Sequence, residues 1–103
     1  MYRGTTPTIA IKLNTDIKLE SLKQIWVTFD NGGGKVITKT IDDVVIDTES
    51  QKMKVSLSQE ETLSFTGASI DIQVRILTDT DVALATPIKS LPVSRVLEGG
   101  IIE

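Results

Sequence analysis

The sequence contains neither cysteine nor histidine. Without cysteine there can be no disulfide, no thiolate metal site and no thiol nucleophile. Without histidine the chain lacks the most frequent general base and the most frequent metal ligand of proteins. A zinc site would need carboxylates alone, and serine–histidine or cysteine–histidine nucleophile pairs are excluded. We therefore expect a protein that is not an enzyme, with no cofactor and no small-molecule substrate.

Aromatic residues and positive charge are also scarce. Tyr2, Trp26, Phe29 and Phe65 are the only aromatic residues, too few for a sugar-stacking platform. The formal net charge is −3 and there is no basic cluster, since Lys52 and Lys54 form the closest pair of lysines. Such a chain should bind neither nucleic acid nor an anionic membrane.

Long apolar runs are missing as well, and the first residues lack the apolar core of a secretory signal. We expect synthesis in the cytoplasm, without a signal peptide.

What the chain does have is apolar residues at every second position, the pattern of half-buried β-strands. The clearest example is the segment 70–76, in which isoleucine and valine alternate with polar residues. Pro87 and Pro92 bracket the last such segment, which indicates an edge strand. The predicted strands are centred on 9–13, 25–29, 36–40, 44–46, 53–57, 70–76, 82–85 and 88–93.

Two connections between these segments have their own chemistry. Ser58, followed three residues later by Glu61, matches a capping box and predicts a short helical turn from Gln59 to Leu63. The run Gly32-Gly33-Gly34-Lys35 lacks the spacing of a phosphate-binding loop and is followed by a strand. It therefore predicts a flexible hairpin loop.

Seven or eight short strands in 103 residues predict one all-β domain, an immunoglobulin-like antiparallel sandwich of about seven strands with one helical turn near 59–63. A barrel is the competing arrangement. We expect loose ends at residues 1–6 and 98–103. The predicted core is listed here: Ile11, Val27, Phe29, Val55, Ile72 and Val74.

Acidic residues lie in three of the predicted loops. If successive strands alternate in direction, the loops carrying Asp30, Asp47 with Glu49, and Asp79 with Asp81 share one end of the sandwich. Oxygen ligands of this kind suit calcium, although the spacing matches no EF-hand. Solvated loops without a strong metal site are the favoured interpretation.

The candidate interaction residues are Trp26 and the apolar part of the C-terminal segment. Trp26 alternates with Ile25 and Val27, so it should point away from the core. It then either packs under the N-terminal arm near Tyr2 or faces a partner. The segment also contains a Gly99-Gly100 hinge, and it could cover Trp26, add to a partner's sheet or fray. Its large aliphatic residues are Val96, Leu97, Ile101 and Ile102.

Several segments together resemble a known group of proteins. They include Arg3-Gly4-Thr5-Thr6-Pro7-Thr8, Trp26-Val27-Thr28-Phe29, residues 55–63, Ile72-Gln73-Val74-Arg75 and Val93-Ser94-Arg95-Val96-Leu97. In this order they resemble small prophage-encoded structural proteins of Gram-positive bacteria, similar to the N-terminal immunoglobulin-like domains of phage baseplate proteins.

The resemblance implies a tail-associated or baseplate-associated structural or assembly role through protein–protein contacts. The partners would be other virion or assembly proteins, including copies of this chain, and the chain could be incorporated into a phage particle. The alternative function is a ligand-binding sandwich module that holds carbohydrate or calcium at the acidic loop end.

Overall fold

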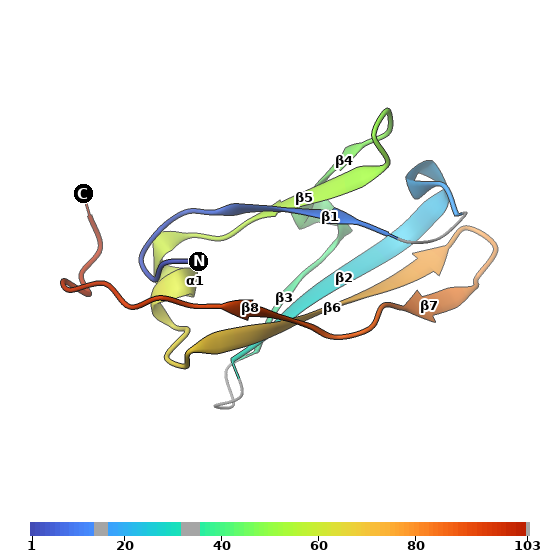
Figure 1. The fold of residues 1–103 in the computed structure, drawn as a ribbon. Helices are drawn as coiled ribbons and strands as arrows, with labels where there is room; N and C mark the ends of the chain where they lie inside the picture. Colours follow the sequence, from blue (N-terminus) through green and yellow to red (C-terminus); the bar gives the residue numbers. More distant parts are fainter. Residues whose placement is uncertain (14–16, 32–35, 103) are drawn as a thin grey trace.

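A computed structural model describes residues 1–13, 17–31 and 36–102 (Figure 1). The Gly32-Gly33-Gly34-Lys35 loop therefore lies outside the described residues. All eight predicted strand segments form strands, and the helical turn begins and ends at the predicted residues. The elements are β1 (Thr8–Lys12), η1 (Leu19–Ser21), β2 (Leu22–Asp30), β3 (Val36–Lys39), η2 (Ile41–Asp43), β4 (Val44–Asp47), β5 (Lys52–Ser56), α1 (Gln59–Leu63), β6 (Ser69–Thr78), β7 (Ala83–Ala85) and β8 (Lys89–Pro92).

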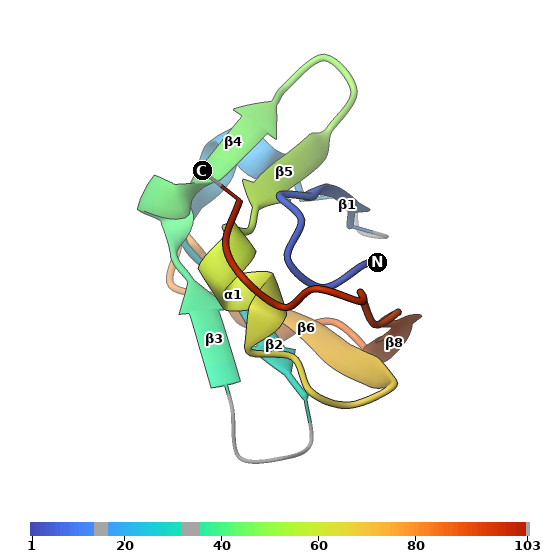
Figure 2. The same cartoon turned by 90° about the vertical axis from the view of Figure 1, so that its left-hand side faces the viewer.

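The strands form two antiparallel sheets packed as a sandwich (Figures 1 and 2). The smaller sheet has the order β1-β5-β4, and the larger has the order β3-β2-β6-β7, with β8 also paired to β6. β7 and β8 pair with successive parts of β6, so they act as one interrupted edge strand. This confirms the predicted all-β sandwich and the edge position of the segment between Pro87 and Pro92.

The strand order corresponds to that of an immunoglobulin domain from its second strand onward. An immunoglobulin domain places strands A, B, E and D in one sheet and C, F and G in the other, with C′ added beside C in variable domains. Here β1, β5 and β4 occupy the places of B, E and D, and β3, β2, β6 and β7–β8 occupy those of C′, C, F and G. In the described part of the chain, no strand occupies the place of A on the outer edge of β1.

The chain crosses between the sheets from β3 to β4 through the single turn η2. Thr40, just before this turn, donates its backbone N–H to Asp43 Oδ2 over 3.0 Å. The next residue, Ile41, donates its N–H to Gln24 Oε1 on β2 over 3.2 Å. These bonds satisfy donors at the start of η2 that would otherwise lack partners. We call this side of the sandwich the closed seam.

The core lies between the sheets. Val27, Phe29, Val55, Ile72 and Val74 are buried, as predicted. The prediction for Ile11 was too strong, because Ile11 is only half-buried. It belongs to β1, which is an edge strand, and an edge strand has a neighbour on only one side.

The helix α1 covers one end of the sandwich (Figure 2). Both bonds of the predicted capping box are present: Ser58 Oγ accepts from the Glu61 N–H over 3.1 Å, and Glu61 Oε1 accepts from the Ser58 N–H over 2.9 Å. Glu61 also forms an ion pair with Lys39, whose Nζ lies 2.7 Å from Oε2. This pair links α1 to β3, on the closed-seam side.

The first six residues, expected to be a loose end, are instead held by hydrogen bonds. Tyr2 forms a parallel bridge with Ser94, and the N–H of Arg3 donates to the Ser94 carbonyl over 3.0 Å. Thr62 Oγ1 donates to the Thr5 carbonyl over 2.8 Å. These bonds fix the N-terminal segment beside α1. Among the described residues, no helix has the length and apolar character needed to cross a bilayer.

Candidate interaction surface

Trp26 lies on the outer face of the five-stranded sheet, as its alternation with buried Ile25 and Val27 predicted. Its side chain is 44% exposed. In the β2–β6 register Trp26 lies directly opposite Arg75, and the guanidinium carbon of Arg75 lies 5.5 Å from the centre of the Trp26 ring. This is cation–π geometry, which holds the ring and the guanidinium together while both stay accessible.

Small side chains leave one flank of this pair open. Ala83 and Ala85 lie beside Leu77 and Arg75 in the β6–β7 register. A shallow cavity of about 170 Å³ results, lined by Gln24, Trp26, Arg75, Ile76, Leu77 and Ala83. We call these six residues the Trp26 face. The face combines an aromatic ring, a fixed positive charge and aliphatic surface, the residue types that dominate protein–protein hot spots.

The N-terminal arm does not provide the cover that was considered for Trp26. Tyr2 pairs with Ser94, next to the β8 end where Pro92 lies opposite Ser69. Arg75, which faces Trp26, is six residues farther along β6, a distance of about 20 Å in an extended strand. Trp26 and Tyr2 therefore belong to different surfaces.

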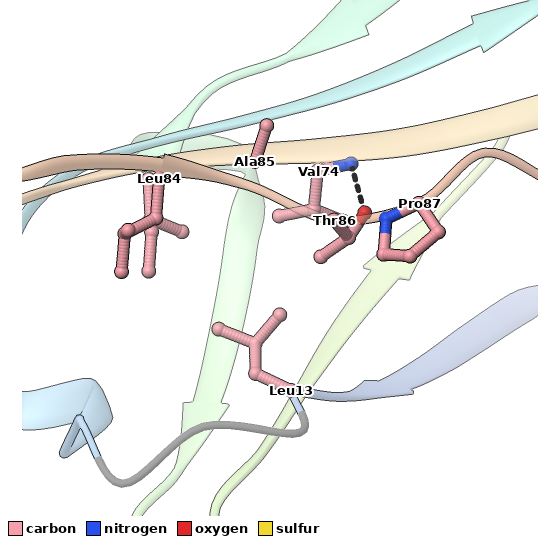
Figure 3. Close-up of a pocket in the computed structure, with 7 residues that line it drawn as sticks. Leu13, Val74, Leu84, Ala85, Thr86 and Pro87 are labelled. Carbon is pink, nitrogen blue, oxygen red and sulfur yellow. Dashed lines mark hydrogen bonds between the residues drawn. The ribbon is translucent and has the colours of Figure 1, made fainter.

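A second feature is an apolar groove between the two sheets, on the side opposite the closed seam. Here β1 faces β7 and β8, and two cavities of about 270 and 260 Å³ share Val74, Thr86 and Pro87 as lining residues. Figure 3 shows Leu13 pointing from the end of β1 toward Val74 and Leu84, with open space between them. We call this side the open seam.

The edge strand beside the open seam is irregular. Between β7 and β8 the pairing with β6 shifts by one residue, and Pro87 lies in the shift. Thr86 compensates there, because its N–H donates to the Val74 carbonyl and its Oγ1 accepts from the Val74 N–H, both within 3.0 Å. A bulge with a proline is a common way to end or redirect edge pairing.

The predicted C-terminal residues lie away from Trp26. Ile102 exchanges two hydrogen bonds with the Gln59 side chain of α1, at 2.8 and 3.1 Å. Leu97 is 98% exposed, Ile101 and Ile102 are also exposed, and Val96 is half-buried. The segment therefore leaves most of its apolar surface in water, and it does not cover the Trp26 face.

The acidic loops do not share one end, so that expectation was wrong. Asp30 lies opposite Asp71 near the start of β6, whereas Asp79 follows Thr78, which lies opposite Leu22. The two ends of the β2–β6 ladder therefore separate Asp30 from Asp79. Because β2 and β6 run antiparallel, the strands do not simply alternate in direction along the chain, and the loops after β2 and β6 lie at opposite ends. Among the described residues, no group of three acidic side chains could hold a metal ion.

Asp47 instead organises its own turn. The hydrogen bond from Ser50, helped by the N–H of Glu49 and the charge of Lys54, lowers the pKa of the Asp47 carboxyl despite a small opposing effect of burial. Each of these contacts is local to the β4–β5 turn and its strands, so the carboxylate has a structural use there.

The register also creates a basic group that sequence spacing did not reveal. Lys12 lies opposite Lys52, and Lys54 lies opposite Ala10, so the three lysines share the outer face of the smaller sheet. Asp47 lies on the other side of Lys52. The sequence could have indicated this cluster only through the correct pairing of β1 with β5.

Comparison with known proteins adds no assignment: no family model, no curated protein and no solved structure matches the chain. The strand order defines the fold class, an all-β antiparallel sandwich of the immunoglobulin type.

Proposed function

We propose that the chain is a phage-derived structural or assembly protein of the tail or baseplate, acting through protein–protein contacts. The observation that carries the contact part of this proposal is the Trp26–Arg75 pair on the outer face of the larger sheet. Burying a half-exposed tryptophan is favourable, and a flanking cavity gives a partner side chain a place to insert. The phage setting comes from the sequence resemblance.

The other residues are consistent with a module that binds rather than reacts. The chain has no histidine or cysteine, and the carboxylates of the described loops are divided between the two ends of the sandwich. The pair on the Trp26 face needs no metal or cofactor to hold its geometry. A partner with an acidic side chain beside an apolar one would complement both Arg75 and the cavity.

The test uses a bacterium that encodes the chain within an inducible prophage. Particles are purified after induction, and the copy number of the chain per particle is measured by quantitative mass spectrometry for the wild type and for Trp26→Thr. We expect a fixed copy number for the wild type and at least about a tenfold loss for Trp26→Thr, the equivalent of one strong contact.

Val36→Thr is the matched control, because Val36 is 57% exposed on the outer edge of the same sheet but lies outside the Trp26 face. It should incorporate as well as the wild type. The proposal fails if the chain is absent from particles and assembly intermediates. It also fails if Trp26→Thr incorporates normally.

A further inference from the structure

The outer edge of β1 presents backbone groups in an unusual setting. The Leu57 N–H donates to the Pro7 carbonyl over 3.1 Å, and the β1–β5 register continues from there without a shift. In an antiparallel ladder, alternate residues bond to the same neighbour. Ile9 and Ile11 therefore bond toward β5, while the N–H and C=O groups of Thr8, Ala10 and Lys12 point to the open seam.

Behind this edge lies an apolar floor. The cavity beside β1 is lined by Ile9, Ile11, Ile72, Val74 and Leu91 together with Pro87, and the cavity that continues it adds Leu13, Ile76 and Leu84. An immunoglobulin domain has strand A at this place, paired with the edge of B. The slot therefore suits one extended segment with apolar side chains at alternate positions.

The C-terminal segment of the same chain has this pattern. We call residues 96–102 the arm. In an extended arm Leu97 and Ile101 point to one side, and Val96, Glu98, Gly100 and Ile102 point to the other. Leu97 is 98% exposed and Ile101 is 53% exposed, so both apolar side chains are available to enter a groove.

Charge also favours the arm as the segment that binds in the groove. When Leu97 and Ile101 enter the seam, Glu98 falls on the outer face of the smaller sheet, where Lys12, Lys52 and Lys54 lie. Lys12 and Lys52 are directly opposite one another, an arrangement of like charges that is destabilising unless an anion lies nearby. Asp47 supplies one carboxylate on the far side of Lys52, and Glu98 would supply another beside β1.

We propose that the arm of one copy adds to the outer edge of β1 of a second copy, filling the open seam at the place of strand A. Leu97 and Ile101 enter the groove, and Glu98 lies beside Lys12. In its own copy the arm lies over α1, held by the two bonds between Ile102 and Gln59. Donor and acceptor are different surfaces, so the contact is heterologous, and repeating it gives a ring or a filament.

This inference goes beyond the proposed function and uses residues outside the Trp26 face. Association is measured by sedimentation velocity over a concentration range up to millimolar. The wild type should associate, and Leu97→Asp should weaken the association at least about tenfold. Val45→Asp is the control, because Val45 is 66% exposed on β4, the other edge of the same sheet, and should associate like the wild type.

Charge reversal tests the position of Glu98. Glu98→Lys and Lys12→Glu should each weaken association, and one chain carrying both changes should recover it. Failure of the double variant to recover would reject the proposed pairing. Trp26→Thr should leave self-association intact, so a failure on the Trp26 face and a failure of the arm remain distinguishable.

Disulfide trapping tests the location directly, because the chain has no cysteine of its own. Gly100→Cys in one copy, mixed with Ala10→Cys in another, should give a covalent heterodimer under mild oxidation. Gly100→Cys mixed with Val45→Cys should not. Gly100 and Ala10 are exposed, so neither change disturbs the core. The proposal is overturned by a monomeric wild type, by equal trapping at Val45, or by a chain carrying both cysteines that closes only on itself.

Discussion

The two seams of the sandwich differ in how they are closed. At the closed seam the chain itself crosses from β3 to β4, and Ile37, Ile41, Val44 and Ile46 pack against the core. At the open seam no such crossing exists among the described residues, and a groove separates β1 from β7 and β8. The difference reaches the core: Ile25, Val27 and Phe29 on β2 are 0% exposed, whereas Ile72, Val74 and Ile76 on β6 are 8%, 3% and 6% exposed.

The crossing from β3 to β4 therefore covers the interior at the closed seam, whereas the interior is less well covered at the open seam. In the described ranges no strand lies on the outer edge of β1, and the inner face of β6 is partly uncovered there, although β6 itself is paired on both sides. Apolar surface open to water in this way has a free energy cost in the monomer, which a partner strand would remove.

The largest expected effect on stability tests the difference between the two seams with two isoleucines. Ile25 and Ile76 lie opposite each other in the β2–β6 ladder, one fully buried and one beside the groove. Ile25→Ala should lower the free energy of unfolding by about 4 kcal/mol and Ile76→Ala by about 2 kcal/mol, since the site beside the groove can relax. Urea denaturation measures both, and equal losses would show that the open seam is as tightly packed as the rest.

A smaller effect concerns the end of the closed seam at α1. Glu61→Ala removes the acceptor for the Ser58 N–H and leaves Lys39 without its carboxylate. Both side chains of the pair are mostly buried, so the loss should be about 2 kcal/mol by thermal or urea unfolding. Glu60→Ala, on the exposed side of the same helix, should change stability by less than about 0.5 kcal/mol. Similar values for the two variants would refute the role assigned to Glu61.

At the open seam, Thr86→Val removes the oxygen that accepts from the Val74 N–H and keeps the shape of the side chain. An unpaired N–H there should lower stability by about 1 kcal/mol. Amide hydrogen exchange should report faster opening at Val74, with little change at Val27 on the closed side. Unchanged protection at Val74 would mean that water already reaches this bond.

The smallest effect is a pH dependence of stability that arises from Glu61, on the closed-seam side. Burial raises the pKa of Glu61, but the Lys39 hydrogen bond, the Ser58 N–H and the Lys39 charge outweigh it, so the pKa lies below its ordinary value of 4.5. The unfolded chain then binds this proton first as the pH falls. The stability from Glu61 is therefore complete above pH 4.5 and is lost as the pH falls through the folded pKa.

Glu61→Gln should remove this part of the pH profile, and Glu60→Gln should leave it in place. Unfolding free energies measured at several pH values from neutral to acidic give both profiles. If Glu61→Gln and the wild type lose stability in parallel, other carboxylates cause the acid sensitivity.

The sequence was sufficient for the strands and the helical cap because these depend on local spacing. Alternation placed the strand segments near 9–13, 25–29, 53–57 and 70–76, and short runs of β-branched or apolar residues indicated the others. The Ser58–Glu61 spacing specified both capping bonds. The two single turns η1 and η2, of three residues each, were missed, although the Thr40–Asp43 capping box of η2 has the same spacing as Ser58–Glu61. Turns this short have no periodicity to detect.

The surfaces depended on register, which local spacing does not contain. Trp26 was correctly placed outside the core, but its partner Arg75 and the flanking alanines come from strands distant in sequence. The acidic loops were misplaced because the prediction assumed that successive strands alternate in direction, whereas β2 and β6 run antiparallel. The lysine group on the smaller sheet and the open seam required the same long-range pairing.

The β2–β6 ladder also has a consequence for how the chain reaches its fold. Trp26 pairs with Arg75, about fifty residues later, so the central ladder forms only after a long loop has closed. Domains dominated by such distant pairings fold on the millisecond-to-second timescale rather than in microseconds. The single tryptophan lies within this ladder, against a charged neighbour, so its fluorescence reports the formation of this long-range contact. A refolding trace followed at this one ring would time the joining of the two halves of the chain.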